Sequence, residues 1–150
     1  RRAAVIRLTE LGDQATVNSV ALNESRSTWE RFPAIARATP SVLEPLLKHA
    51  EGQIRQAALG RIGKPAFAAL LNDPDESVAY SLEQALIQAP DKAEANRMLV
   101  SLARRQPVDR AAQAAAEALR ARGFTVKTVE KYLNSHARVP TLTGYEVKFA

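Results

Sequence analysis

Arginine and lysine gather in the last third of the chain, where they could bind phosphate or carboxylate groups. Residues 101–150 contain nine Lys and Arg against four Asp and Glu, whereas residues 1–50 carry a net charge of +2 and residues 51–100 one of −2. Fifteen of the 21 basic residues are arginine, whose planar guanidinium forms paired hydrogen bonds with phosphates and carboxylates. This region is suited to nucleic acid or to an acidic partner, although charged runs more often form solvated helix faces.

Four polar residues near the C-terminus have the spacing of one helix face. Lys127, Lys131, Asn134 and Arg138 stand at i, i+4, i+7 and i+11. A helix over these residues, stacked beside the two helices before it, would bring further arginines into one patch able to neutralise several phosphates. These further residues are Arg104, Arg105, Arg110, Arg120 and Arg122. Aromatic residues that could stack on bases are few, with four Phe, three Tyr and one Trp in the whole chain.

No pattern typical of an active site or a metal centre occurs in the sequence. The absence of cysteine rules out disulfides, thiolate metal sites, iron–sulfur clusters and a cysteine nucleophile. His49 and His136 lack a partner at metal-ligand spacing, and the acidic run at residues 73–76 lacks the glycine and the terminal glutamate of a calcium loop. Phosphate-binding glycine loops and zinc-protease motifs are also absent. We therefore expect no catalytic residue, no metal and no cofactor, and we expect residues 73–76 to form a turn that caps a helix.

Apolar residues recur at helical spacing almost throughout, as Val5, Leu8 and Leu11 illustrate. Helix starts are marked by a cap residue three positions before a glutamate, as in Ser27 and Glu30. These signals predict ten short helices, over roughly 1–11, 13–22, 28–38, 41–50, 53–62, 65–72, 76–88, 91–105, 108–122 and 126–137. Pro33 is expected to kink or interrupt the third helix. We expect Trp29, the sole tryptophan, to pack with Phe32 under that kink, with a role in a binding surface as the alternative.

A repeat of about 24 residues relates parts of the chain. It aligns Leu46 with Leu70 and Arg31 with Arg55. A helix pair this short cannot bury its own apolar stripe, so it must stack on its neighbours. We expect the buried area to come from leucines 46, 47, 59, 70, 71, 82, 86, 99, 102 and 119. Small residues at the helix seams are expected at Ala57, Ala58, Ala68, Ala69, Ala111, Ala115 and Ala118.

Three segments carry a resemblance to a known family: residues 2–13 (RAAVIRLTELGD), 54–60 (IRQAALG) and 70–78 (LLNDPDESV). They resemble the helices and turns of HEAT-like repeats, in particular the short bacterial HEAT and leucine-rich repeat variant types. The resemblance covers residues 1–122 and implies an all-α fold, an α-solenoid of about five stacked antiparallel helix pairs. It also implies a protein that holds another macromolecule.

The helical repeat domain is expected to span residues 1–138. Residues 139–150 are expected to form a short extended tail, because Pro140 stops the last helix and Tyr145, Val147 and Phe149 alternate. This tail either caps the last helix pair or begins a following domain or a strand paired with a partner. Since Met98 is the sole methionine, we expect the chain to be a processed product or a fragment.

The function expected from these features is a non-catalytic scaffold that binds a protein partner. The candidate partner-binding residues are Lys48, His49, Arg97, Arg104, Arg105, Arg120, Arg122, Lys127 and Lys131. A nucleic-acid-binding solenoid is one alternative, and an accessory domain of a larger enzyme is another. No apolar run approaches the roughly 18 residues of a membrane span. The composition is typical of a high-GC bacterium and leaves cytoplasmic, periplasmic and secreted locations open, with the cytoplasm slightly favoured.

Overall fold

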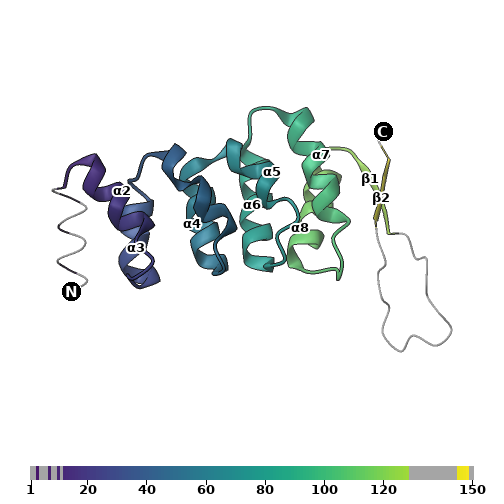
Figure 1. The fold of residues 1–150 in the computed structure, drawn as a ribbon. Helices are drawn as coiled ribbons and strands as arrows, with labels where there is room; N and C mark the ends of the chain where they lie inside the picture. Colours follow the sequence, from purple (N-terminus) through teal and green to yellow (C-terminus); the bar gives the residue numbers. More distant parts are fainter. Residues whose placement is uncertain (1–2, 4–6, 8–9, 11, 129–144, 149–150) are drawn as a thin grey trace. The chain divides into compact units, whose positions relative to one another are not determined.

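The structure is a computed structural model that describes residues 3, 7, 10, 12–128 and 145–148. Its regular elements are helices from the N-terminal residues as far as Ala121, which confirms the predicted all-α class for that region (Figure 1). Two short strands follow, β1 (Thr125–Thr128) and β2 (Tyr145–Lys148). The chain divides into two compact units, unit 1 (residues 1–70) and unit 2 (residues 71–150).

Unit 1 is built from short helices, and α3 starts at the predicted cap Ser27. Its elements after the first helical residues are α2 (Gln14–Leu22), α3 (Thr28–Ile35), the 3-10 helix η1 (Pro40–Lys48), α4 (Gly52–Ile62), the 3-10 turn η2 (Lys64–Ala66) and α5 (Phe67–Leu70). The Asp13 carboxylate accepts a hydrogen bond from the Thr16 N–H at the start of α2. Consecutive elements pair, α2 with α3 and η1 with α4, and α3 also packs beside α4.

Proline lies inside two of the predicted helices in unit 1 and changes the type of one of them. The helix expected over 41–50 is a 3-10 helix, and Pro45 inside it has no N–H to donate to an i−4 carbonyl. Pro33 does not end α3, which continues through it for two further residues. The core of this unit is aliphatic, and it includes three fully buried residues that were not among the predicted leucines: Ile35, Leu43 and Ile54.

Two arginines of unit 1, one repeat step apart, bond to carbonyls where a preceding helix ends. Arg31 is 2% exposed, and its Nε donates to the Ala21 carbonyl at 3.0 Å. Arg55 Nη1 donates to the carbonyls of His49 (2.7 Å) and Ala50 (3.0 Å). The last carbonyls of a helix have no intrahelical donor, so these guanidinium groups satisfy acceptors that would otherwise need water. The aligned arginines of the repeat are therefore part of its internal structure.

Unit 2 is built around three longer helices. They are α6 (Glu76–Gln88), α7 (Lys92–Ala103) and α8 (Arg110–Ala121). Asp75, Asp91 and Asp109 each accept a backbone N–H at the start of the following helix. Helix α8 packs against both α6 and α7, and β1 lies beside α8. The predicted turn at residues 73–76 therefore caps a helix, as expected.

Alanines on α8 allow close contact with its neighbours. Ala111, Ala112, Ala115 and Ala116 are buried there, as is Leu119 of the same helix. Nearly all the leucines predicted to supply the core are buried, at 46, 59, 70, 82, 86, 99, 102 and 119. The predicted seam residues Ala68 and Ala69 are exposed instead, because α5 is a single turn that buries only Phe67 and Leu70.

The helix predicted over 126–137 is wrong at its start, because residues 125–128 form strand β1. Strand β1 pairs with β2 in an antiparallel ribbon, with Val126 opposite Val147 and Lys127 opposite Glu146. The local sequence Thr-Val-Lys-Thr-Val is rich in β-branched residues, which favour strands over helices. The extended character expected for residues 145–148 is confirmed. Lys131, Asn134 and Arg138 lie outside the described residues.

A carboxylate is buried in the core of unit 2. Glu83 is 1% exposed, and its Oε2 accepts a hydrogen bond from Gln84 Nε2 at 2.6 Å. Burial raises the pKa of the Glu83 carboxyl above its ordinary value, the Gln84 hydrogen bond and the Arg122 charge oppose that rise, and the Glu117 charge adds to it. Ionised Glu83 therefore costs folding free energy at neutral pH.

The substitution Glu83→Gln is expected to raise the free energy of unfolding at pH 7, because a neutral amide of the same shape replaces a desolvated charge. A raised native pKa means that the cost is absent when the carboxyl is protonated, so the advantage should shrink as the pH falls and vanish below about 4.3, the usual glutamate value. Urea unfolding followed by circular dichroism over this pH range measures it. The exposed Glu44→Gln control should change stability by less than about 0.5 kcal/mol. A difference independent of pH would contradict the assignment.

Candidate binding site

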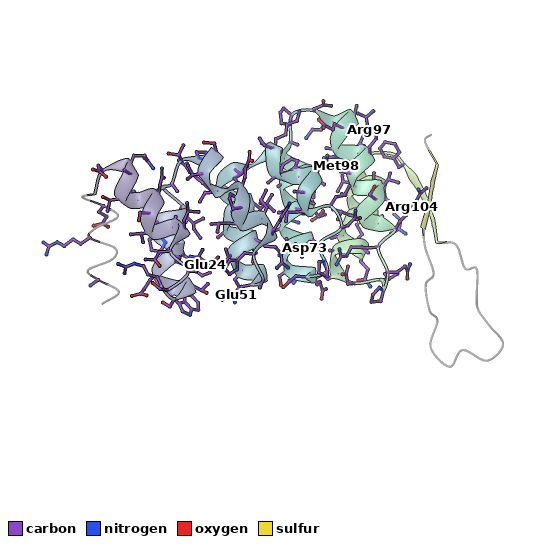
Figure 2. All side chains as sticks on the ribbon, in the orientation of Figure 1. Glu24, Glu51, Asp73, Arg97, Met98 and Arg104 are labelled. Carbon is purple, nitrogen blue, oxygen red and sulfur yellow. The ribbon has the colours of Figure 1, made fainter. Side chains whose placement is uncertain are left out.

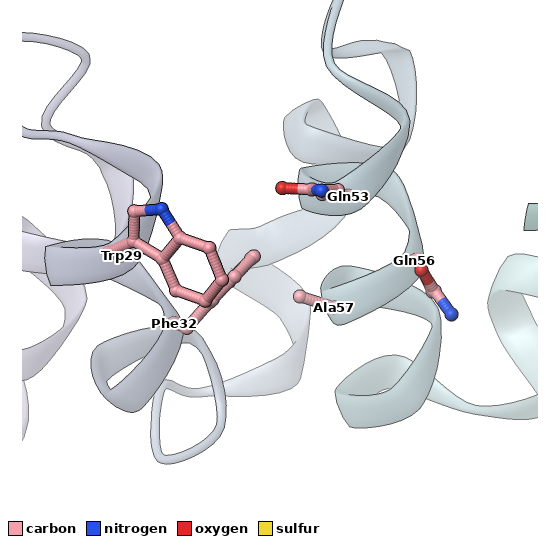
Figure 3. Close-up of a pocket in the computed structure, with 5 residues that line it drawn as sticks. All are labelled: Trp29, Phe32, Gln53, Gln56 and Ala57. Carbon is pink, nitrogen blue, oxygen red and sulfur yellow. The ribbon is translucent and has the colours of Figure 1, made fainter. Parts of the chain in front are cut away.

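An open hollow lies between α3 and α4 in unit 1. It has a volume of about 350 Å³ and is lined by Trp29 and Phe32 from α3 and by Gln53, Gln56 and Ala57 from α4. Figure 3 shows the two aromatic rings projecting from α3 toward α4. Their centroids are 5.5 Å apart and their planes meet at 82°, an edge-to-face arrangement. We call this feature the Trp29 hollow.

Hydrogen bonds at the starts of α3 and α4 fix the helix turns that carry the residues of the Trp29 hollow. The Ser27 N–H donates to the Glu30 carboxylate at 3.0 Å, and the Glu30 N–H donates to the Ser27 carbonyl. This capping box fixes the first turn of α3, which carries Trp29. Thr28 Oγ1 also donates to the Glu51 carboxylate at the N-cap of α4, at 2.5 Å. The start of α3, which carries Trp29, and the start of α4, which carries Gln53, are therefore joined by a hydrogen bond to a carboxylate.

Trp29 is a surface residue, so the prediction that it packs under Pro33 is wrong. Its side chain is 61% exposed, and the edge-to-face contact with Phe32 supports it from one side. Among the described residues, Leu22 and Trp29 are the large apolar side chains that are exposed. An exposed tryptophan that packs against a second aromatic ring has the character of a binding hot spot.

The α4 side of the hollow was not predicted from the sequence. Gln53 and Gln56 stand one repeat step of 24 residues after Trp29 and Phe32. The repeat alignment could therefore have predicted these two lining residues, since equivalent positions of adjacent repeat helices face the same side. No residue that lines the hollow is charged, and the Gln53 amide has no hydrogen-bond partner among the described residues. The site offers aromatic surface and a free amide.

Unit 2 contains a larger cleft of about 620 Å³ between the turn at residues 71–76 and the connection from α7 to α8. Arg105 holds its walls together, since its Nε pairs with the Asp109 carboxylate at 2.9 Å and its Nη1 donates to the Asp73 carbonyl at 2.7 Å. The Asp73 side chain is buried and accepts the Asp75 N–H. The cleft thus brings together the acidic run and the predicted Arg104 and Arg105, but their hydrogen bonds mainly stabilise two turns.

The predicted partner-binding residues lie in different environments. Four are exposed: Lys48 at the end of η1, Arg97 in α7, Arg104 at the C-cap of α7 and Arg120 in the last turn of α8 (Figure 2 labels Arg97 and Arg104). Lys127 belongs to β1, and Lys131 lies outside the described residues. Whether these residues bind a partner stays a prediction.

The other three predicted residues are engaged inside their own unit. His49 is half-buried, its Nδ1 accepts the Glu51 N–H at 3.0 Å, and its Nε2 is 3.3 Å from Arg31 Nη1. Arg105 bridges the cleft walls as described above. Arg122 is half-buried, and its Nη1 donates to Asn96 Oδ1 at 2.5 Å. The other terminal nitrogen of Arg122 donates to carbonyls in the last turn of α6, including that of Ile87 at 3.1 Å.

No group of three or more His, Asp or Glu side chains in the described part of the chain is arranged to hold a metal ion. Among the same residues, no helix has both the length and the apolar character needed to cross a membrane. No protein family, curated protein or solved structure has a detectable match to this chain.

The substitution Arg122→Ala is expected to lower the free energy of unfolding by about 1–3 kcal/mol, because it removes hydrogen bonds from a charged donor to partly buried acceptors on α6 and α7. Arg120→Ala removes the same charge two residues away from an exposed position and should change stability by less than about 0.5 kcal/mol. Urea titration followed by circular dichroism compares the two variants. Equal changes in the free energy of unfolding would show that the hydrogen bonds of Arg122 to α6 and α7 do not stabilise unit 2.

Proposed function

We propose that this chain is a protein-interaction module that binds a segment of a partner protein at the Trp29 hollow. In this proposal the helix pairs belong to a HEAT-like α-solenoid of about five pairs, with the faces of the second helices available to the partner. The observation that carries the proposal is the exposed Trp29 ring, held edge-to-face on Phe32 beside a hollow of about 350 Å³. Rigid aromatic surface of this kind contributes strongly to protein interfaces.

The chemistry of the hollow supports a macromolecular partner over a catalytic role. Its lining holds no acid, base or nucleophile; it offers an indole ring, a phenyl ring, a methyl group and two primary amides. Such groups bind by apolar contact and by hydrogen bonds to a peptide backbone. An accessory role within a larger enzyme stays an alternative. In that case the catalytic residues would belong to another part of the enzyme, and the lining of this hollow would need none.

The nucleic-acid alternative has less support. Arg105 and Arg122, two of the arginines expected in the phosphate-binding patch, use their guanidinium groups for hydrogen bonds within unit 2. The helix expected to carry Lys127 begins as a strand. Exposed Arg97 and Arg120 remain available to an anionic partner.

The substitution Trp29→Ala is expected to weaken peptide binding at least about tenfold, because truncating a central aromatic anchor typically removes that much affinity. Peptides selected from a displayed library on the wild-type chain would be titrated against both proteins by isothermal calorimetry. The matched control is Leu22→Ala, which truncates the other exposed large apolar side chain of unit 1. Selected peptides that bind all three proteins equally would overturn the proposal for this hollow.

A protein-binding role also predicts that the chain does not bind nucleic acid appreciably. We expect no change in the fluorescence anisotropy of labelled duplex or single-stranded DNA and RNA at about 50 mM salt, where electrostatic binding is easiest to detect. Micromolar binding that weakens steeply as salt rises would instead favour the nucleic-acid alternative. Loss of that binding in an Arg97→Ala, Arg120→Ala double variant would then locate it on α7 and α8.

A further inference from the structure

The contact between α6 and α8 contains a cation–π pair. The Arg110 guanidinium carbon lies 4.3 Å from the centre of the Tyr80 ring, and Arg110 Nη2 donates to the Tyr80 hydroxyl at 3.4 Å. Tyr80 is the fifth residue of α6 and Arg110 the first residue of α8. The Arg110 N–H also donates to the Glu76 carboxylate at 2.8 Å, which joins the starts of the two helices. The guanidinium group at the start of α8 thus covers an aromatic ring of α6.

The contact between α3 and α4 is built in the same way but has no such cation. Phe32 is the fifth residue of α3, as Tyr80 is of α6, and the helix starts are again joined, here by Thr28 and Glu51. The first residue of α4, however, is Gly52, in the position that Arg110 occupies in α8. The aromatic pair of unit 1 therefore faces the uncharged Trp29 hollow.

The charge nearest to the lining residues in sequence favours a positive ligand. The exposed Glu51 carboxylate stands two residues before Gln53 and accepts a hydrogen bond from Thr28, the residue before Trp29. Aromatic ring faces carry negative potential and attract ammonium or guanidinium groups, Trp most strongly. The aromatic ring faces and the carboxylate therefore both attract a cation. The guanidinium group of Arg55, the next arginine along α4, donates to backbone carbonyls.

From these observations we infer that the Trp29 hollow binds an arginine side chain of the partner protein, in the position that Arg110 takes in unit 2. Arginine fits better than lysine because its planar guanidinium can stack on an indole while its edge bonds to a carboxylate or an amide oxygen. The Gln53 amide, which has no partner among the described residues, supplies such an oxygen. This inference rests on the proposed function and specifies the partner's chemistry.

The test uses Trp29 as its own reporter, since it is the sole tryptophan of the chain. The whole chain, labelled with ¹⁵N, would be titrated with a Gly/Ser peptide containing three arginines, and the indole N–H signal of Trp29 followed by NMR. The control peptide replaces each arginine by citrulline, which has nearly the same shape and no charge. We expect the arginine peptide to bind at least about fivefold more tightly than the citrulline peptide, the preference of a partly exposed cation–π contact.

Two glycine variants give a matched comparison. Gly52→Arg supplies the missing cation from α4 itself and is expected to reduce binding of the arginine peptide at least about fivefold. Gly60→Arg adds the same charge about 12 Å farther along α4, at an exposed position where a Cβ meets no atom within 4 Å, and should reduce binding less than twofold. Thermal unfolding by circular dichroism confirms that both variants fold.

The outcomes separate this inference from the proposed function. Equal binding of arginine and citrulline peptides, with the Trp29 signal shifting in both, would overturn the arginine preference and leave the hollow as a peptide site. Equal loss of binding in both glycine variants would also overturn it, because added charge alone would explain the loss. If library-selected peptides and the arginine peptide all leave the Trp29 signal unchanged at about 20 mM, a concentration at which even very weak binding is detectable, the proposed function itself fails.

Discussion

Hydrogen bonds from guanidinium groups to backbone carbonyls at or just beyond helix ends connect the elements within each unit. A chain of short helices has many ends, and each end leaves carbonyl groups that no intrahelical N–H can reach. Arginine suits this role because it carries five donors on a stem long enough to reach a neighbouring helix. Five arginines donate in this way, each to a carbonyl in the last turn of a helix or within three residues of its end: Arg31 to Ala21, Arg55 to His49, Arg61 to Ala38, Arg105 to Asp73 and Arg122 to Ile87.

This use of arginine changes what the net charge of the chain means. Arginines with donors bonded to carbonyls still repel other cations, but they have fewer donors left for the paired hydrogen bonds that make arginine effective at phosphates. Arg105 and Arg122 came from the most basic third of the sequence, and both connect elements within unit 2. Excess positive charge in a helical repeat chain therefore indicates nucleic-acid binding only when the side chains are both exposed and free of carbonyl partners.

The sequence predicted local structure well where a capping residue or an apolar periodicity was compatible with only one type of secondary structure. Asp75 and Ser27 mark helix starts because their side chains or backbone satisfy N–H groups of the next turn, a purely local interaction. Val126 and its neighbours fitted a helix face and a strand equally well, and pairing with residues about twenty positions later decided for the strand. Trp29 could not be placed from its own spacing, because its exposure depends on which side chains α4 presents opposite it.

The repeat alignment becomes most informative where equivalent contacts differ. Both Phe32 and Tyr80 stand at the fifth position of a helix whose first residue is hydrogen-bonded to the start of the next repeat helix. Equivalent positions such as these help adjacent repeat helices to pack on each other. If packing were their only role, we would expect the α3–α4 and α6–α8 contacts to use the same pair of residue types. The α6–α8 contact covers its ring with Arg110, whereas α4 begins with Gly52 and keeps small or uncharged residues along the facing side. Leaving a tryptophan exposed forgoes the burial of a large apolar surface, so a ligand that covers the ring would recover free energy that folding alone does not.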